Sequence, residues 1–300
     1  MFKKSRRRGF TSPAPLYCRK AHLGAALIVV AFLTDTVLAS IPSYSWLKEY
    51  DESNSIAKRI FPSKGYVRTE TEKGSFAEWL RNLPLKKEST PVYLYDSIEK
   101  ANQNAHFAVV DIDTGKRDLQ QCADAVMRLR AEYLYSKKNY KAIHFNFTNG
   151  QRADFTKWSQ GFKPVEVANK IEWRKSVENN ASYESFRKYL DAVFIYAGSY
   201  SLSKELEKVE SIKEMEIGDV FIKGGFPGHA VIVVDMAVNK ETGKKAFLLA
   251  QSYMPAQDIH ILKNPAKKDS DPWYNLDFGN ELKTPEWTFK AGELMRFKQE

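Results

Sequence analysis

A cysteine and a histidine in this sequence have the residue types that nucleophilic catalysis requires. Cys122 lies in the run DLQQCADAVMRLRAEYLY, and His229 follows a Gly-Gly-Phe-Pro-Gly loop at the start of an apolar run. A thiolate is a strong nucleophile, and a neighbouring imidazole lowers the thiol pKa and serves as general base and acid. About a hundred residues separate the two. The sequence therefore raises the hypothesis that the fold brings Cys122 and His229 together as a catalytic pair.

A third polar residue usually orients the imidazole in such a pair. Two apolar runs flank a turn signal at Asn239–Gly243, and this pattern predicts a β-hairpin. If paired residue numbers in this hairpin have an even sum, His229 and Gln251 point to the same face, whereas an odd register separates them. Gln251 is therefore the expected orienting residue. The runners-up with the same parity are Tyr253 and Asp235.

The surroundings of Cys122 predict a helix that starts close to the thiol. Apolar residues recur at helical spacing over Asp118–Tyr135, with Asp118 as the expected N-cap, so Cys122 falls in the first turn. A helix N-terminus stabilises a thiolate. The Cys122 backbone N–H, aided by the side chain of Gln120 or Gln121, would stabilise an oxyanion. The expected substrate contacts are Gln121, Gly228 and Tyr253.

Each of these residues also has an ordinary structural role. Cysteine is among the most buried residue types, a histidine can cap a strand, and a glutamine can be a hydrogen-bonded core amide. The alternative hypothesis is therefore a non-catalytic envelope protein that binds peptide or glycan in the same cleft. The state of the Cys122 thiol discriminates between the two hypotheses.

The N-terminal segment has the pattern of a secretory signal peptide. A basic region precedes the apolar run Leu23–Leu33, and Val37-Leu38-Ala39 fits a small-residue cleavage site. We therefore expect residues 1–39 to be a signal peptide and the protein to be exported, periplasmic or secreted. An uncleaved N-terminal anchor is the alternative. After cleavage we expect no membrane span.

Signal cleavage changes both the charge and the cysteine content. The formal net charge of the full chain is +9. Residues 40–300 carry 39 basic and 36 acidic residues, or +3, so we expect no nucleic-acid partner. Of the two cysteines only Cys122 remains, and a single cysteine forms no intramolecular disulfide. It is either a reactive thiol or a buried apolar residue.

The order of the elements predicts the α+β class. Most helices precede a dense block of strands, so we expect a single domain over 40–300, with helices packed on a largely antiparallel sheet. An N-terminal subdomain up to about residue 100 is the alternative. The expected helices are Asn54–Ile60, Phe76–Leu83, Asp118–Tyr135, Thr156–Phe162, Tyr183–Ala197 and Leu202–Val209. The expected strands are Tyr66–Thr71, Val92–Tyr95, Phe107–Ile112, Ala142–Phe147, Ala230–Met236, Ala246–Ala250, Asp258–Leu262 and Thr288–Phe297.

Most of the chain resembles a bacterial family called domain of unknown function 4846. The segments that carry the resemblance lie between roughly Ser75 and Phe297, and they are DLQQCADAVMRLRAEYLY, GGFPGHAVIVVDMA, FLLAQSYMPAQDIHILKNP and PWY. This resemblance implies an exported protein and no particular activity.

A looser resemblance is to the NlpC/P60 and CHAP cysteine peptidases. Gly218-Asp219-Val220 and Gly228-His229-Ala230-Val231 are similar to the motifs around their catalytic histidine, and Cys122 matches their nucleophile. Gln121-Cys122-Ala123-Asp124 stands where they have Asp-Cys-Ser-Gly. The resemblance implies a papain-like fold and hydrolysis of amide bonds in cell-wall peptides, with Cys122 as nucleophile, His229 as base and Gln251 as orienting residue.

Other kinds of site find little support. The sequence contains no G-x-S-x-G, Walker or dinucleotide-binding pattern. Asp111–Gly115 lacks the third acid and the glutamate of an EF-hand calcium loop, and His229 with His260 lacks a third metal ligand. We therefore expect no cofactor and no metal. A cell-wall peptide or glycan is the expected partner.

Overall fold

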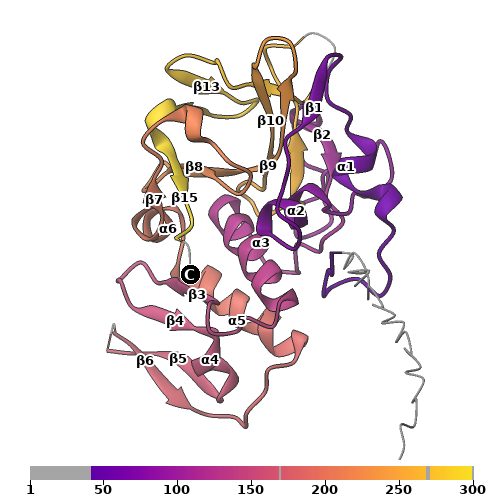
Figure 1. The fold of residues 1–300 in the computed structure, drawn as a ribbon. Helices are drawn as coiled ribbons and strands as arrows, with labels where there is room; N and C mark the ends of the chain where they lie inside the picture. Colours follow the sequence, from indigo (N-terminus) through magenta and orange to yellow (C-terminus); the bar gives the residue numbers. More distant parts are fainter. Residues whose placement is uncertain (1–41, 169, 268–270, 299–300) are drawn as a thin grey trace, which may run out of the picture. The chain divides into compact units, whose positions relative to one another are not determined.

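The described chain is built around one large antiparallel sheet (Figure 1). The computed structural model describes residues 42–168, 170–267 and 271–298, so the predicted signal peptide at 1–39 lies outside the described residues. In this part of the chain the sheet has nine strands. The prediction of an α+β protein with a largely antiparallel sheet is confirmed.

The described residues, from residue 42 onward, belong to one compact unit. The helices are α1 (Ile56–Arg59), α2 (Phe76–Arg81), α3 (Cys122–Ser136), α4 (Phe155–Ser159), α5 (Tyr183–Tyr196) and α6 (Ser199–Glu205), with 3₁₀ turns at Glu52–Asn54, Gln103–Ala105, Ile212–Glu214 and Ala291–Glu293. The first eight strands are β1 (Tyr66–Arg68), β2 (His106–Val109), β3 (His144–Asn146), β4 (Arg152–Asp154), β5 (Phe162–Val167), β6 (Lys170–Lys175), β7 (Glu207–Lys208) and β8 (Val220–Lys223). The others are β9 (His229–Asn239), β10 (Lys245–Gln251), β11 (His260–Leu262), β12 (Tyr274–Asn275), β13 (Glu281–Lys283), β14 (Thr288–Lys290) and β15 (Leu294–Arg296). The nine-stranded sheet has the order β2-β11-β10-β9-β8-β15-β7, and in addition β1 pairs with β9 and β12 pairs with β10. No helix in the described ranges has the length and apolar content of a membrane span.

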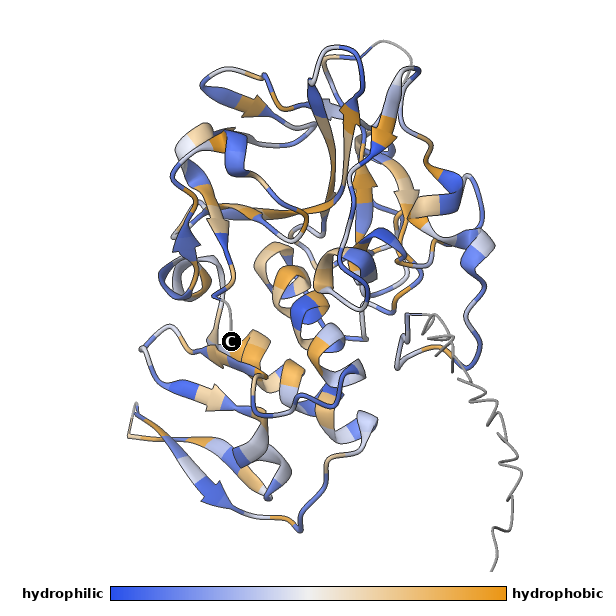
Figure 2. Cartoon of the chain, viewed as in Figure 1, coloured by the Kyte–Doolittle hydropathy of each residue, from blue (hydrophilic) through white to orange (hydrophobic). Residues whose placement is uncertain are grey.

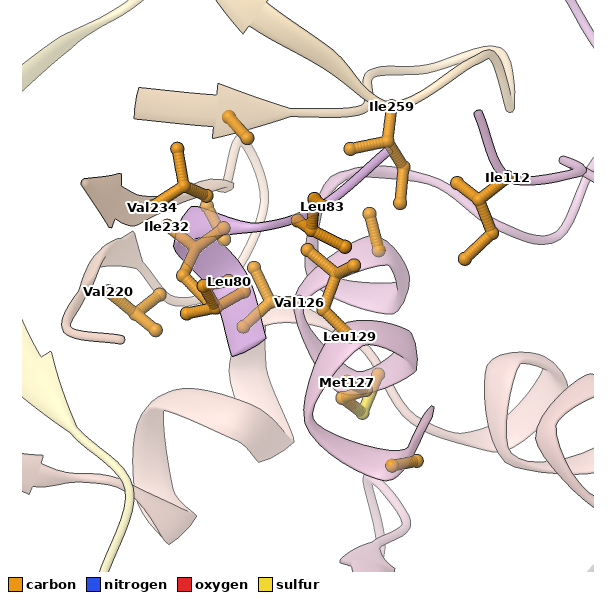
Figure 3. Close-up of a cluster of buried hydrophobic side chains, with 14 of the residues drawn as sticks. Leu80, Leu83, Ile112, Val126, Met127, Leu129, Val220, Ile232, Val234 and Ile259 are labelled. Atoms are coloured by element: carbon orange, nitrogen blue, oxygen red, sulfur yellow. The ribbon is translucent and has the colours of Figure 1, made fainter. Parts of the chain in front are cut away.

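Strand β9 is buried on both faces, and its two faces belong to different hydrophobic clusters. Successive side chains of a strand point to opposite faces. Ile232 and Val234 join the cluster that includes α2 and α3 (Figure 3). Val231 and Val233 join a second cluster with Phe221 on the other face. Figure 2 shows the same concentration of hydrophobic residues along the central strands.

The predicted hairpin of β9 and β10 forms, but its register changes along its length. Near the turn, Leu248 pairs with Asp235, so the residue sum is odd. A β-bulge between Leu248 and Leu249 shifts the register, and Ala250 then pairs with Ile232, with an even sum. The even register is therefore wrong near the turn and confirmed near the predicted site. A bulge adds one residue to one strand, and this extra residue restores the alignment.

Asp235 lies at this bulge and does not serve as a partner of the histidine. Its carboxylate accepts hydrogen bonds from Arg68 Nε at 2.7 Å, from Arg81 Nε at 2.6 Å and from the Met236 N–H at 2.8 Å. The side chain is fully buried. Asp235 therefore joins β1 and α2 to β9, and its expected role as a runner-up for the orienting residue is wrong.

Several other predictions from the sequence differ from the structure. Val92–Tyr95 forms only isolated bridges, in which Tyr93 pairs with Glu99 and Leu94 with Gln257. The expected helix Leu202–Val209 begins earlier, as α6, and the chain then enters β7. The hairpin of β5 and β6 was not predicted, and in it Pro164 lies in a two-stranded sheet, where every strand is an edge strand.

We predict that Asp235→Ala strongly destabilises the fold. The substitution leaves two arginine side chains beside a buried site without their carboxylate, and breaking a buried ion pair costs about 3–5 kcal/mol. Urea denaturation of the unsubstituted protein and of Asp235→Ala measures the difference in their free energies of unfolding. The exposed Asp277 provides the control, because a surface Asp277→Ala substitution should change stability by less than about 0.5 kcal/mol. Equal stabilities of the two variants would contradict the structural role of Asp235.

Candidate active site

Cys122 is the first residue of α3, as the sequence predicts. The expected N-cap is wrong, because Gln121 and not Asp118 precedes the helix. Asp118 Oδ1 instead accepts hydrogen bonds from Gln121 Nε2 at 3.0 Å and from the Ala256 N–H at 2.7 Å. The Gln121 N–H donates to Asp124 Oδ2 at 3.1 Å. The helix therefore starts at the thiol itself.

His229 is the first residue of β9 and is only 1% exposed. Its ring packs against Tyr253, Trp287 and Phe289, with centroid distances of 4.7, 5.3 and 5.8 Å. The preceding Gly228 lies so close to other backbone that an added Cβ would be 2.3 Å from a carbonyl oxygen. A glycine at this position thus allows the loop to pack closely at the start of β9.

One cavity of about 370 Å³ contains both members of the predicted pair. Cys122 and His229 line it, and the three predicted substrate contacts, Gln121, Gly228 and Tyr253, line it as well. A larger cavity of about 640 Å³ lies between α2, α3 and β15 and contains none of these residues. The fold thus gathers residues from α3, β9 and the segment after β10 around a single space.

The thiol and the imidazole approach this cavity from different sides of β9. Cys122 comes from the α3 side, and its sulfur lies beside the backbone N–H of Ala230. His229 has the same face as Val231, which points away from α3. Among the described residues, no hydrogen bond joins the Cys122 thiol to the His229 ring. The two groups therefore line one cavity without a hydrogen bond between them.

The pKa of the Cys122 thiol is raised to about 11. Burial is the largest cause, and the nearby Asp124 carboxylate adds to it. Backbone N–H groups of Ala230, Ala123 and Cys122 lower the pKa in part. Desolvation disfavours the charged form of a thiol, and here it outweighs the effect of the helix N-terminus. The lowered pKa expected from the sequence is therefore wrong for the ligand-free chain.

Gln251 binds the histidine, as predicted, and a buried polar network fixes its amide. Its Oε1 lies 2.8 Å from His229 Nε2. Its Nε2 donates to Glu286 Oε2 at 2.9 Å and lies 3.3 Å from His260 Nε2. Lys100 forms an ion pair with Glu286. Because the carboxylate requires a donor, the amide nitrogen faces Glu286 and the amide oxygen faces His229.

This orientation determines the tautomer of His229. The Gln251 oxygen accepts only, so Nε2 of His229 carries the proton and Nδ1 has the free lone pair. Within the described ranges, Nδ1 has no hydrogen-bond partner. The pKa of His229 is lowered to about 4, mainly because burial disfavours the imidazolium. His229 is thus a neutral imidazole whose free nitrogen can accept a proton.

Three members of this network were missed in the sequence analysis. His260 pairs directly with Gln251 across β10 and β11, a register that its strand signal could have suggested. Glu286 and Lys100 come from distant loops, and no local pattern indicates them. Gln120 is not part of the cavity, because its side chain accepts from Arg128 at 2.7 Å. The proposed oxyanion role is therefore wrong for Gln120 and remains a prediction for Gln121.

Metal ligands are not grouped in this part of the chain. Among the described residues, no three His, Cys, Asp or Glu side chains are placed to hold a metal ion. The network instead supplies a proton acceptor, an orienting amide and a thiol. This set of groups suits acyl transfer through a covalent thioester.

Comparisons with known proteins give one match. A family model described as "Domain of unknown function (4846)" matches residues 56–296. No curated protein matches the chain, and no solved structure matches it. The looser resemblance to the NlpC/P60 and CHAP peptidases receives no support from these comparisons.

We predict that His229 makes the fold less stable in mild acid. Its folded pKa, about 4, lies below the unfolded value of about 6.5, so only the unfolded chain takes up a proton between these values. Stability present at pH 7.5 is therefore lost as the pH falls toward 4. Between pH 7.5 and 5 this residue should cost about 2 kcal/mol. Urea denaturation at both pH values should show that His229→Gln, which does not titrate, loses correspondingly less; an equal loss in both proteins would contradict the lowered pKa.

We also predict that the Cys122 thiol of the ligand-free protein resists alkylation near neutral pH. Because its pKa is about 11, the rate with iodoacetamide should rise with a midpoint near that value. The same protein in urea is the control, and its thiol should titrate near about 8.5. Fast labelling at pH 6 that disappears in His229→Ala would show a thiolate–imidazolium pair and would contradict the resting state described above.

Proposed function

Since the chain belongs to the family described as "Domain of unknown function (4846)", which names no reaction, we propose a function from the site itself: an exported, papain-like cysteine hydrolase that cleaves amide bonds of cell-wall peptides. Cys122 is the nucleophile, His229 the general base and acid, and Gln251 the orienting residue. One observation carries the proposal. A cysteine at a helix N-terminus and a histidine oriented by an amide line the same cavity.

The groups present can complete an acyl transfer with every proton accounted for. As the Cys122 sulfur attacks the substrate carbonyl carbon, His229 Nδ1 takes the thiol proton. The carbonyl oxygen becomes an oxyanion, which the Cys122 N–H and the Gln121 side chain stabilise. His229 then gives its proton to the leaving amine as the C–N bond breaks. Water, activated by the same nitrogen, hydrolyses the thioester and restores the thiol.

The raised thiol pKa selects one version of this mechanism. A neutral thiol and a neutral imidazole are the resting state, since the pKa of Cys122 is raised to about 11 and that of His229 is lowered to about 4. Proton transfer therefore accompanies attack on the substrate and is not completed beforehand. Substrate binding also has to bring the sulfur within hydrogen-bond reach of His229 Nδ1, because no hydrogen bond joins the two groups among the described residues.

Two further features support the choice of reaction and place. The helix–sheet arrangement of α3 against β9 agrees with a papain-like fold, in which a helix carrying the nucleophile packs on an antiparallel sheet. The signal-peptide pattern of the first 39 residues agrees with an exported, periplasmic enzyme. The choice of cell-wall peptide rests on export and on the resemblance to NlpC/P60 peptidases.

A second function is favoured by the state of the thiol. A half-buried, protonated Cys122 with no hydrogen bond to His229 among the described residues is also what a binding protein would have. In this alternative the chain is a non-catalytic envelope protein that holds peptide or glycan in the same cavity. Trp287 and Tyr253 at its wall would then provide stacking surfaces.

We predict that the purified protein, residues 40–300, releases new amino groups from cell-wall peptide fragments. Cys122→Ala and His229→Ala should lower the rate at least about 1,000-fold, because each removes a reacting group. Gln251→Ala should lower it about 10- to 100-fold, since His229 then loses its orienting bond. Mass spectrometry of the products measures the cleavage and identifies the bond.

The control for this experiment is Asp277→Asn, a surface substitution that should leave the rate unchanged. Thermal melting of each variant shows whether it remains folded. Turnover that persists in Cys122→Ala, or no turnover by the unsubstituted protein, would refute the hydrolase and leave the binding protein as the better proposal.

A further inference from the structure

Tyr253 lies beside both members of the proposed catalytic pair. It lines the cavity that Cys122 and His229 share. Its ring centroid is 4.7 Å from that of His229. A negative charge on the Cys122 sulfur raises the pKa of the phenol, so the hydroxyl lies within electrostatic range of the thiol. The Tyr253 hydroxyl therefore belongs to the part of the cavity in which a bond attacked by Cys122 has to lie.

The ring of Tyr253 has neighbours on its faces, but its hydroxyl has no partner in the chain. The Lys100 ammonium lies 5.5 Å from the ring centroid, and Lys100 is itself held by its ion pair with Glu286. The contacts with His229 and Lys100 fix the position of the ring. Among the described residues, no hydrogen bond reaches the hydroxyl. Because a tyrosine O–H in a partly buried place usually has a partner, a ligand in the cavity is the natural acceptor.

The oxyanion donor expected from the sequence is partly engaged elsewhere. Gln121 Nε2 donates a hydrogen bond to Asp118 Oδ1 at 3.0 Å. One of the two amide hydrogens of Gln121 is thus used within the chain. Oxyanion holes are built from preorganised donors, and tyrosine hydroxyls are among the groups that serve in them. A further donor at the cavity wall would therefore complete the set that the Cys122 N–H begins.

We propose that Tyr253 is a further catalytic residue, whose hydroxyl donates a hydrogen bond to the substrate carbonyl oxygen as that oxygen becomes an oxyanion. The proposal rests on the function proposed above, in which the Cys122 sulfur attacks this carbonyl. As the C–S bond forms, the π electrons of the carbonyl move to its oxygen, and the Tyr253 O–H bond stays intact. When the C–N bond breaks and the amine leaves, the C=O bond forms again and the hydrogen bond weakens.

The surroundings of Tyr253 keep its hydroxyl protonated and therefore able to donate. Burial is the main reason that its pKa is raised, and the negative charge of Glu286 adds to the effect. An oxyanion accepts a stronger hydrogen bond than a neutral amide carbonyl, since hydrogen bonds to charged groups are the strong ones. The contribution of Tyr253 thus grows between the bound substrate and the transition state. Interactions of this kind raise kcat more than they lower KM.

The test compares the turnover of cell-wall peptide fragments by Tyr253→Phe and by the unsubstituted protein. Phenylalanine keeps the ring that packs against His229 and removes only the hydroxyl oxygen. We expect kcat to fall about 100-fold or more with KM within about twofold, because the loss of one oxyanion donor costs about 100- to 1,000-fold in kcat. Tyr200→Phe is the matched control and should keep the full kcat, since Tyr200 is 50% exposed and does not line the cavity.

A second measurement separates the oxyanion role from a merely structural one. A peptide aldehyde adds to the Cys122 thiol and gives a hemithioacetal, whose oxygen takes the place of the oxyanion, whereas the matching peptide alcohol binds without a covalent bond. Tyr253→Phe should weaken inhibition by the aldehyde about tenfold or more and inhibition by the alcohol less than about twofold. Equal weakening of both inhibitors, or a clearly lower melting temperature of Tyr253→Phe, would show that the hydroxyl only supports the cavity and would overturn the proposal.

The unsubstituted protein distinguishes failure of this proposal from failure of the proposed hydrolase. If it turns over and Tyr253→Phe has the same kcat, the assignment of Tyr253 is overturned and the hydrolase stands. If the unsubstituted protein cleaves no peptide, the hydrolase fails and the role of Tyr253 fails with it.

Discussion

The β-bulge in the hairpin of β9 and β10 is the constraint on which the site depends. Without the extra residue, the odd register near the turn would continue to the end of the hairpin and place His229 and Gln251 on opposite faces. Asp235, next to the bulge, is held by Arg68 and Arg81 from two other elements. A buried ion-pair cluster thus lies beside the bulge that aligns His229 with Gln251.

The polar network behind His229 has a cost and a benefit. Burial makes His229 and His260 weak bases, and it brings the Lys100–Glu286 pair out of water. In exchange, both ends of the Gln251 amide have specific partners, so the amide has a single orientation and His229 a single tautomer. A catalytic base gains from this precision, because the same ring nitrogen, Nδ1, is always the proton acceptor.

The sequence predicted the elements with strong periodicity and missed those set by distant contacts. The helix at Cys122 and the long hairpin were predicted from local patterns. Gln251 was predicted as the partner of His229 from the even sum of paired residue numbers. The bulge depends on tertiary packing, which cannot be read from whether two residue numbers have an odd or an even sum. Glu286 reaches the site from a loop after β13. Asp118 does not cap the helix, because its side chain accepts a hydrogen bond from the Ala256 N–H instead. The raised pKa of the Cys122 thiol was also not predicted, because burial depends on the whole fold and not only on the start of the helix.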